Sequence, residues 1–285
     1  MQGELIFVLG PTAVGKTAYA IELARELGSP IINCDSRQIF KEMRIGTAVP
    51  SKEELELVRH YFIQTHTIEK PYTAGEYELE ALELIEKLFR QHSHLVVCGG
   101  SCLYADALCN GLDAFPDADP QLRATLNSRL QSEGLEALRR ELSLLDPDSF
   151  RTIDLSNPRR VVRALEVTIQ TGKRYSQWKS SPKKSRPFSI RKIGLARERE
   201  ILYDRINSRV EKMVADGLEE EARGLIGKRN LPALNTVGYK EMFQYLDGTI
   251  SLERAKELIS RNTRHYAKKQ LSYWARDKEI EWIKL

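Results

Sequence analysis

The segment LIFVLGPTAVGKTAYAIELARELG, Leu5–Gly28, decides the fold of this chain. It begins with five apolar residues, passes through a loop with two glycines and ends in apolar residues at helical spacing. A strand, a tight loop and a helix in direct succession start an α/β unit. The loop fits the pattern G-x-x-x-x-G-K-[ST], so we predict a phosphate-binding loop, or P-loop, that ends in Lys16 and Thr17.

The chemistry of such a loop favours a di- or triphosphate. Its backbone N–H groups and the N-terminus of the following helix attract anions. Lys16 adds a positive charge, and the Thr17 hydroxyl is suited to a ligand position on Mg²⁺. On the motif alone, the default ligand is ATP or another nucleotide. The candidate binding residues are Gly10, Pro11, Thr12, Ala13, Val14, Gly15, Lys16 and Thr17.

The alternation of strand and helix continues after the P-loop. We predict a second strand over Pro30–Asp35 and a third in HLVVCGG from His94. Between them lies a helix that starts with a capping box of Thr73 and Glu76, and a further helix begins at Ser101. This order implies a parallel sheet with helices on both faces.

The pattern changes to purely helical signals after Pro116. Asp119 and Asn157 are each followed by proline, which is typical of a helix N-cap and first helical position. A strand over Ser189–Ala196, several helices, a long helix over about 251–275 and a terminal strand in EIEWIKL follow. We therefore predict an α/β fold with a P-loop-type parallel sheet core flanked by helices, over 1–115 and 188–285, and an all-helical insertion domain over 116–187.

Composition excludes some classes of protein and leaves others open. The 285 residues carry a net charge of +4, and the longest apolar runs are strand-sized, so we expect no membrane-spanning segment. The N-terminus has no basic region followed by an apolar stretch, so we expect no secretory signal. Cys34, Cys98, Cys102 and Cys109 match no zinc spacing. We expect them to be reduced cytosolic thiols that pack as small apolar groups.

Positive charge is concentrated in two places. No acidic residue occurs between Glu166 and Glu198, an interval with nine basic residues: Lys173, Arg174, Lys179, Lys183, Lys184, Arg186, Arg191, Lys192 and Arg197. Arg261, Arg264 and Lys268 fall on one face of the last long helix. Such runs indicate either a solvated face or a surface for a polyanion such as nucleic acid.

The predicted strand ends carry a single carboxylate. Asp35 closes the second strand, whereas the third ends in Gly99, Gly100 and Ser101. Substrates of open α/β sheets bind at the carboxyl ends of the strands. Asp35 is therefore a candidate for the acid that holds Mg²⁺ in P-loop NTPases or for a catalytic base, and the residues alone leave both roles open.

Seven motifs occur in order between Gly10 and Arg276: GPTAVGKT, DSRQIF, IGTAVPS, GGSCLY, NPRRVVRALE, VGYKE and RNTRHYAKKQLSYWAR. Apart from the P-loop each is generic, but the ordered set resembles the tRNA dimethylallyltransferases, or tRNA isopentenyltransferases, over nearly the whole chain. That family has a P-loop-type core with a helical insertion. Its members transfer a dimethylallyl group from dimethylallyl diphosphate to N6 of the adenosine 3′-adjacent to the anticodon, so diphosphate is the leaving group.

The resemblance also implies roles for single residues. Asp35 takes the place of the general base, and Arg209 that of the arginine that binds diphosphate. Ser101 stands at the usual threonine position, whose hydroxyl contacts the diphosphate or the adenosine, and Cys102 stands where glycine is common. Mg²⁺ would be the cofactor, with Thr17 as its ligand. Segments that contact tRNA in the family correspond here to Asp35, Ser36, Arg37, Gln38, Ser101, Arg123, Arg159, Arg160, Val161, Val162, Arg163, Asn235, Thr236, Val237, Gly238, Tyr239 and Lys240.

We expect a cytoplasmic, monomeric tRNA prenyltransferase with no membrane partner. Three other functions are alternatives to it. An enzyme that prenylates free adenine nucleotide needs no RNA surface, and the helical insertion argues against it. A P-loop small-molecule kinase would transfer phosphate, and a non-enzymatic RNA-binding NTP switch would need no base. Arg160 and Arg163 are equally suited to pair with Glu166 as to contact RNA.

Overall fold

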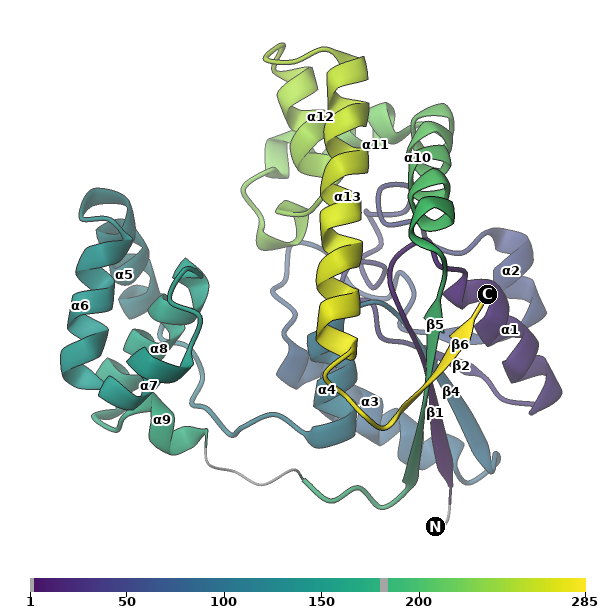
Figure 1. Ribbon diagram of the computed structural model, residues 1–285, viewed down its shortest axis with the longest axis horizontal. Coiled ribbons are helices and arrows are strands. Elements are labelled where there is room, and N and C mark those ends of the chain that lie inside the picture. Colours follow the sequence, from purple (N-terminus) through teal and green to yellow (C-terminus); the bar gives the residue numbers. More distant parts are fainter. Residues whose placement is uncertain (1–2, 180–183) are drawn as a thin grey trace. The chain divides into compact units, whose positions relative to one another are not determined.

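The computed structural model describes residues 3–179 and 184–285, and its chain forms two compact units (Figure 1). The larger unit consists of Met1–Asn110 and Arg186–Leu285, and the smaller one of Gly111–Ser185. The predicted boundaries of the smaller unit, 116 and 187, each lie a few residues later in the chain than those of the structure. Lys183, in the basic interval, lies outside the described residues.

The larger unit is built on a six-stranded parallel sheet with the order β3-β2-β4-β1-β5-β6. This confirms the predicted α/β class. In chain order the strands are β1 (Glu4–Leu9), β2 (Ile31–Asn33), β3 (His60–Tyr61), β4 (His94–Cys98), β5 (Ser189–Ala196) and β6 (Ile280–Lys284).

The central strand β1 explains why the first segment of the sequence decides the fold. It pairs with β4 on one side and β5 on the other, with Leu5 opposite both Leu95 and Ile190. Ile6 and Val8 join a cluster that includes residues of the first helix, and alternate residues such as Phe7 point to the opposite face and are equally buried. A strand covered on both faces needs an unbroken apolar run.

Eight α-helices accompany the sheet in the described part of the larger unit: α1 (Lys16–Glu26), α2 (Lys52–Leu57), α3 (Ala74–Leu88), α4 (Cys102–Asn110), α10 (Arg199–Ala215), α11 (Leu218–Leu225), α12 (Tyr239–Leu246) and α13 (Leu252–Trp274). Two 3₁₀ turns, Ile226–Lys228 and Pro232–Leu234, lie between α11 and α12. None of the helices in residues 3–179 and 184–285 is long and apolar enough to cross a membrane.

Helix starts follow the local capping signals. The predicted capping box at α3 is present, since the Thr73 hydroxyl accepts from the N–H of Glu76 and the Glu76 carboxylate accepts from the N–H of Thr73. Ser51 and Glu54 form the same box at α2, an element not among those predicted although the sequence has the S-x-x-E pattern. The strand β3 was not predicted either, because it is only two residues long.

The smaller unit is a bundle of α5 (Pro120–Ser132), α6 (Leu135–Leu145), α7 (Pro147–Thr152), α8 (Pro158–Thr171) and α9 (Tyr175–Trp178). Asp119 and Asn157 cap α5 and α8 as predicted, each accepting from two backbone N–H groups. Leu126, Leu142 and Leu165 belong to its own apolar core. Residues 184–188 form no regular structure, so the helical signal ends before the predicted boundary at 187.

Candidate active site

The P-loop runs from the end of β1 to the start of α1 and is braced by its own lysine. The Lys16 ammonium donates to the carbonyls of Gly10 and Pro11, at 3.0 and 2.8 Å. Gly10 has a φ of 140°, and a Cβ there would lie 2.6 Å from the carbonyl oxygen of Leu195, so only glycine fits. Burial lowers the pKa of Lys16, and the charge of Arg209 lowers it further.

Gln270 on α13 joins the P-loop to the end of β4. Its side-chain oxygen accepts from the N–H of Thr12 at 2.8 Å, and its amide nitrogen donates to the carbonyl of Gly100 at 2.7 Å. The residue is only 2% exposed. Gln270 lies in the motif RNTRHYAKKQLSYWAR, but no role for it can be predicted from the sequence, because its two partners are far away in the chain.

Three arginines contact consecutive residues of the P-loop. Arg197, after β5, donates to the carbonyl of Val14 at 2.8 Å, and Arg205 on α10 donates to that of Ala13 at 2.7 Å. One helical turn further along α10, Arg209 donates to the Thr12 hydroxyl at 3.2 Å. Burial lowers the pKa of Arg209, with the charge of Arg205 as the second cause.

Only Arg209 among these three was predicted to bind diphosphate. No motif assigns such a role to Arg197 or Arg205, but the spacing of Arg205 from Arg209 is a signal. Residues four apart on a helix share a face, so Arg205 had to lie beside Arg209. The partners of all three are neutral carbonyl or hydroxyl oxygens, so the loop keeps a surplus of positive charge.

Asp35 lies just beyond β2, with one carboxylate oxygen held by the backbone. Oδ1 accepts from the N–H of Arg37 at 2.8 Å and from that of Gln38 at 3.3 Å. Oδ2 faces Gly100: it lies 3.6 Å from the point where a Cβ of Gly100 would be, and the Lys16 nitrogen lies 3.8 Å from the same point. The structure thus brings the predicted base and the P-loop lysine together.

Ser101 ties the end of β4 to the loop that carries Asp35. Its hydroxyl accepts from the N–H of Ser36 at 2.8 Å and donates to the Ser36 hydroxyl at 2.9 Å. The adjacent Cys102 thiol is partly buried, and burial raises its pKa to about 12. Cys34 and Cys109 are buried and Cys98 and Cys102 partly so, in keeping with the predicted packing as small apolar groups, and burial raises the pKa values of all four thiols.

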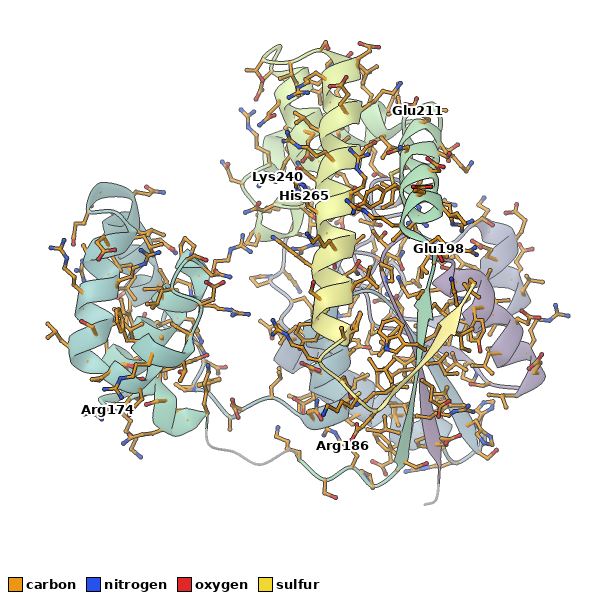
Figure 2. All side chains as sticks on the ribbon, in the orientation of Figure 1. Arg174, Arg186, Glu198, Glu211, Lys240 and His265 are labelled. Carbon is orange, nitrogen blue, oxygen red and sulfur yellow. The ribbon has the colours of Figure 1, made fainter. Side chains whose placement is uncertain are left out.

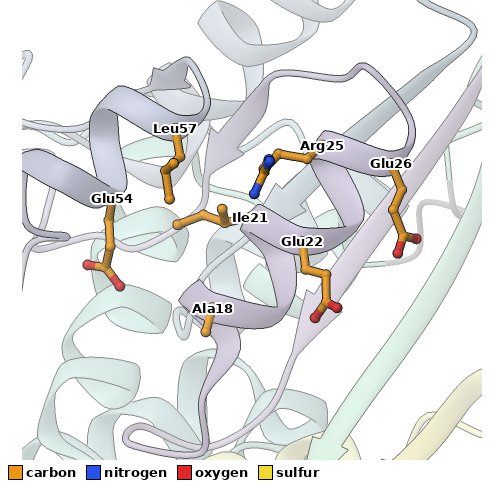
Figure 3. Close-up of a pocket in the computed structure, with 7 residues that line it drawn as sticks. All are labelled: Ala18, Ile21, Glu22, Arg25, Glu26, Glu54 and Leu57. Carbon is orange, nitrogen blue, oxygen red and sulfur yellow. The ribbon is translucent and has the colours of Figure 1, made fainter.

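A cavity of about 930 Å³ collects these groups. Lys16, Thr17, Asp35 and Arg209 line it, together with Gln38, the 44–51 loop and residues of α10 and α13. A second depression of about 640 Å³ lies between α1 and α2 (Figure 3). Its charged lining residues are Glu22, Arg25, Glu26 and Glu54, and this acidic excess disfavours a polyphosphate, so the first cavity is the candidate active site.

The donors around the P-loop suit Mg²⁺ carried by a phosphate ligand. Among the described residues no three His, Cys, Asp or Glu side chains gather into a metal site. Mg²⁺ usually keeps several waters and binds through one or two protein groups plus substrate phosphates. The Thr17 hydroxyl lines the cavity with Asp35, and this small donor set fits that mode.

The predicted tRNA-binding segment on α8 separates into exposed and buried residues. Arg159 and Arg160 are exposed in the first turn, whereas Val161 and Val162 are buried in the apolar core of the smaller unit. The two valines were named as part of a contact segment, but the helix turns their side chains inward, so they support the segment without offering a surface.

The other two predicted arginines of this unit share one buried acid. Arg123 and Arg163 each donate to Oε2 of Glu166 at 2.7 Å, and Glu166 is fully buried. Arg160 and Arg163 were the two candidates for pairing with Glu166. In the structure Arg163 pairs with it, and so does Arg123. Arg160 makes no such contact in the described structure.

The segment before α12 is also mixed. Asn235 and Lys240 are exposed, and Thr236 and Val237 are half-buried. Gly238 has a φ of 99°, which favours glycine. Tyr239 is fully buried, and its hydroxyl donates to Glu221 at 2.6 Å, so its side chain is part of the core and not of a surface.

The basic interval does not form one face. Arg186, at the start of the segment that leads into β5 (Figure 2), is paired with Glu78 at 2.9 Å in the interior. Lys192 is 6% exposed and contacts Asp277 and Glu279. These acids come from distant parts of the chain and offset charges that seemed unopposed in the sequence. On α13, Arg264 donates to Asn207 at 2.7 Å, whereas Arg261 and Lys268 are exposed.

Comparison with known proteins places this site in a family. The family model described as IPP transferase matches residues 38–278. The tRNA dimethylallyltransferase 1 of Bacteroides thetaiotaomicron is 47% identical over 279 residues, which cover 98% of this chain and 91% of that protein. The tRNA dimethylallyltransferase of Christiangramia forsetii is 47% identical over 283 residues, 99% of this chain and 94% of its own.

Solved structures agree. The full-length tRNA isopentenylpyrophosphate transferase from Bacillus halodurans superimposes with a TM-score of 0.73 and 35% identity, over 99% of this chain and 90% of that one. A eukaryotic dimethylallyltransferase acting on tRNA gives a TM-score of 0.83 and 25% identity, over 99% of this chain and 74% of its own. The resemblance drawn from the ordered motifs is therefore confirmed, and the chain belongs to the IPP transferase family, together with the tRNA dimethylallyltransferases.

Proposed function

We propose that this chain transfers the dimethylallyl group from dimethylallyl diphosphate to N6 of the adenosine 3′-adjacent to the anticodon of tRNA, and releases diphosphate. The observation that carries the proposal is the convergence of Asp35 Oδ2 and the Lys16 ammonium on Gly100 in one cavity. A base and a cation at one point suit a reaction in which an amine loses a proton while an anion departs.

The diphosphate end of the reaction rests on the P-loop and α10. Negative charge grows on the diphosphate as its bond to the allylic carbon breaks. Lys16, Arg205, Arg209 and the loop N–H groups stabilise that charge in a partly buried site, where such groups act most strongly. Mg²⁺, held by Thr17 and diphosphate oxygens, would add further positive charge.

The amine end rests on Asp35. An exocyclic adenine amine is a weak nucleophile, so removal of its proton as the new N6–carbon bond forms assists the attack. Oδ1 is fixed by two backbone N–H groups, which leaves Oδ2 to take the proton. Ser101, bonded to Ser36, holds the Asp35 loop beside the end of β4 and is the other predicted contact to substrate.

The tRNA end involves both units. Bases in a single-stranded loop can be unstacked and recognised by their edges, and chemistry on a base requires its removal from the stack. We expect the accessible predicted residues to make these contacts: Ser36, Arg37, Gln38, Arg123, Arg159, Arg160, Asn235 and Lys240. A monomeric state and a cytoplasmic location stay predictions, which gel filtration and fractionation of cells would check.

A transfer assay tests the proposal against its alternatives. Labelled dimethylallyl diphosphate is incubated with the protein and either tRNA or AMP, and label on tRNA is expected. Label only on AMP would indicate an adenylate prenyltransferase. ATP turnover without prenyl incorporation would indicate a kinase, and full biological function of Asp35→Ala would favour a non-enzymatic switch. Analysis of nucleosides in tRNA from cells without this protein should show the loss of N6-dimethylallyladenosine.

A further inference from the structure

A carboxylate outside the cavity lining holds one wall of the cavity. Glu221, on α11, accepts four hydrogen bonds: from the N–H groups of Arg44 and Ile45 on Oε2, at 2.9 and 2.8 Å, and from the N–H of Gly46 and the hydroxyl of Tyr239 on Oε1, at 2.9 and 2.6 Å. Three consecutive backbone N–H groups that converge on one anion form an anion-binding nest. Here the anion is a side chain of the protein itself.

The site is built for a carboxylate and for this loop. A glutamine would present one acceptor oxygen and an NH₂ group that would face N–H donors, so about half of the bonds would be lost. A Cβ on Gly46 would lie 2.7 Å from the ring of Tyr239, so glycine lets the loop approach the ring. Tyr239 is fully buried, and burial followed by the charge of Glu221 raises its pKa, which keeps the phenol a donor.

The same loop is hydrogen-bonded to Gln38, which is in turn hydrogen-bonded to Asp35. The side-chain amide of Gln38 donates to the carbonyls of Thr47 and Ala48, at 3.1 and 2.9 Å. The backbone N–H of Gln38 in turn donates to Asp35 Oδ1. A continuous set of hydrogen bonds and backbone therefore leads from α11 to the general base proposed above. The loop fixes the orientation of the Gln38 side chain, because its carbonyls accept from the amide nitrogen, and the amide oxygen then points away from those two carbonyls.

We propose that Glu221 is a positioning residue for prenyl transfer, which acts through the 44–48 loop on the orientation of Gln38 and on Asp35. The inference rests on the function proposed above. Errors of about 1 Å in the placement of reacting groups can reduce rates by about 10²-fold, so a distant carboxylate that sets a loop can control catalysis.

The diphosphate end should not depend on Glu221. The bonds that brace the P-loop connect Lys16, Thr12 and Gln270 with Gly10, Pro11 and Gly100, and none includes the 44–48 loop. Loss of Glu221 should therefore lower kcat on tRNA and leave the affinity for inorganic pyrophosphate unchanged. A purely structural role would reduce both together.

The test uses the full-length chain with Glu221→Gln, Gln38→Ala and the double variant. Glu220→Gln is the matched control, because Glu220 is the exposed neighbour on the same helix. Steady-state transfer to tRNA gives kcat and KM, and calorimetry with inorganic pyrophosphate gives affinity and the fraction of competent protein. We expect kcat of Glu221→Gln to fall on the order of tenfold or more, and Glu220→Gln to behave like the wild type.

Two further readouts separate positioning from general damage. In the Gln38→Ala background Glu221→Gln should cause little further loss, since residues that act through one another are not additive. Glu221→Asp, which keeps both acceptor oxygens, should recover part of kcat.

The inference is overturned by additive effects, by an unchanged kcat of Glu221→Gln, or by a parallel loss of pyrophosphate binding. If the wild type itself transfers no label to tRNA, the proposed function fails and not this step.

Discussion

Two acidic residues of this protein, Asp35 and Glu166, each lie near cations, but their surroundings differ. Asp35 has one oxygen bonded to backbone N–H groups, and the other lies, like the Lys16 nitrogen, close to Gly100 at the cavity. Glu166 is fully buried in the smaller unit, and one of its oxygens accepts from both Arg123 and Arg163. One carboxylate is left available for chemistry, and the other holds helices together.

The arginines around them differ in the same way. Arg197, Arg205 and Arg209 contact neutral oxygens of the P-loop, so their charge remains available to an anion. Arg123 and Arg163 share a carboxylate, which offsets one of their two charges. We therefore expect the partner of a charged group, and not its presence in a basic motif, to decide whether it binds ligand or stabilises the fold.

The largest effect is expected at Asp35. Asp35→Asn keeps an oxygen for the N–H groups of Arg37 and Gln38 but has no base, so kcat should fall by about 10²–10⁴-fold, with pyrophosphate affinity retained. Transfer assays and calorimetry measure the two quantities. A kcat near that of the wild type would show that Asp35 is not the general base, and Asp35 and Glu166 would then not differ in function as argued above.

Glu166→Ala should act on stability instead. Two partly exposed arginines would lose their shared partner, and a hydrogen bond to a charged group contributes about 1.5–3 kcal/mol, so we expect a loss in that range. Denaturant unfolding followed by circular dichroism measures the change. The control is Glu133→Gln, which removes an exposed pair with Arg129 in the same unit and should cost less than about 1 kcal/mol. Equal losses in the two variants would show that burial of Glu166 has no special weight.

Arg209→Ala should weaken the grip on the leaving group. Removal of one preorganised donor to a developing anion reduces kcat by about 10²–10³-fold, and pyrophosphate affinity should fall as well. Arg209→Lys keeps the charge and should retain part of both. Arg229→Gln, which loses only an exposed contact to Asp247, is the control. If Arg209→Ala binds pyrophosphate like the wild type, the arginine is structural.

The smallest effect concerns salt. If Arg159 contacts an RNA phosphate, Arg159→Gln should make the negative slope of log affinity against log salt concentration shallower by about 0.7–0.9, with a modest loss of affinity. Arg123→Gln should change the slope less, because Glu166 offsets its charge. Filter binding of tRNA at several salt concentrations measures both. A flat response of the wild type would show that the basic residues are only solvated surface.

Local signals determined much of this protein from the sequence alone. The strand over Ser189–Ala196, the P-loop between a strand and a helix, and the caps at Thr73, Asp119 and Asn157 depend on residues close together in the chain. Patterns of burial and capping act over a few residues, so they can be recognised without a structure. The ordered motifs added the family, because their combination is specific even where each one is not.

Only the tertiary structure decided which residues meet. Gln270 bonds to Thr12 across 258 positions, Arg205 to Ala13 across 192, and Glu221 to Gly46 across 175. The same holds for Glu166, whose buried carboxylate accepts from Arg123 across 43 positions of the chain, a pairing that the sequence did not predict. Side-chain direction and long-range partners depend on how the elements pack, and no pattern of nearby residues encodes that packing.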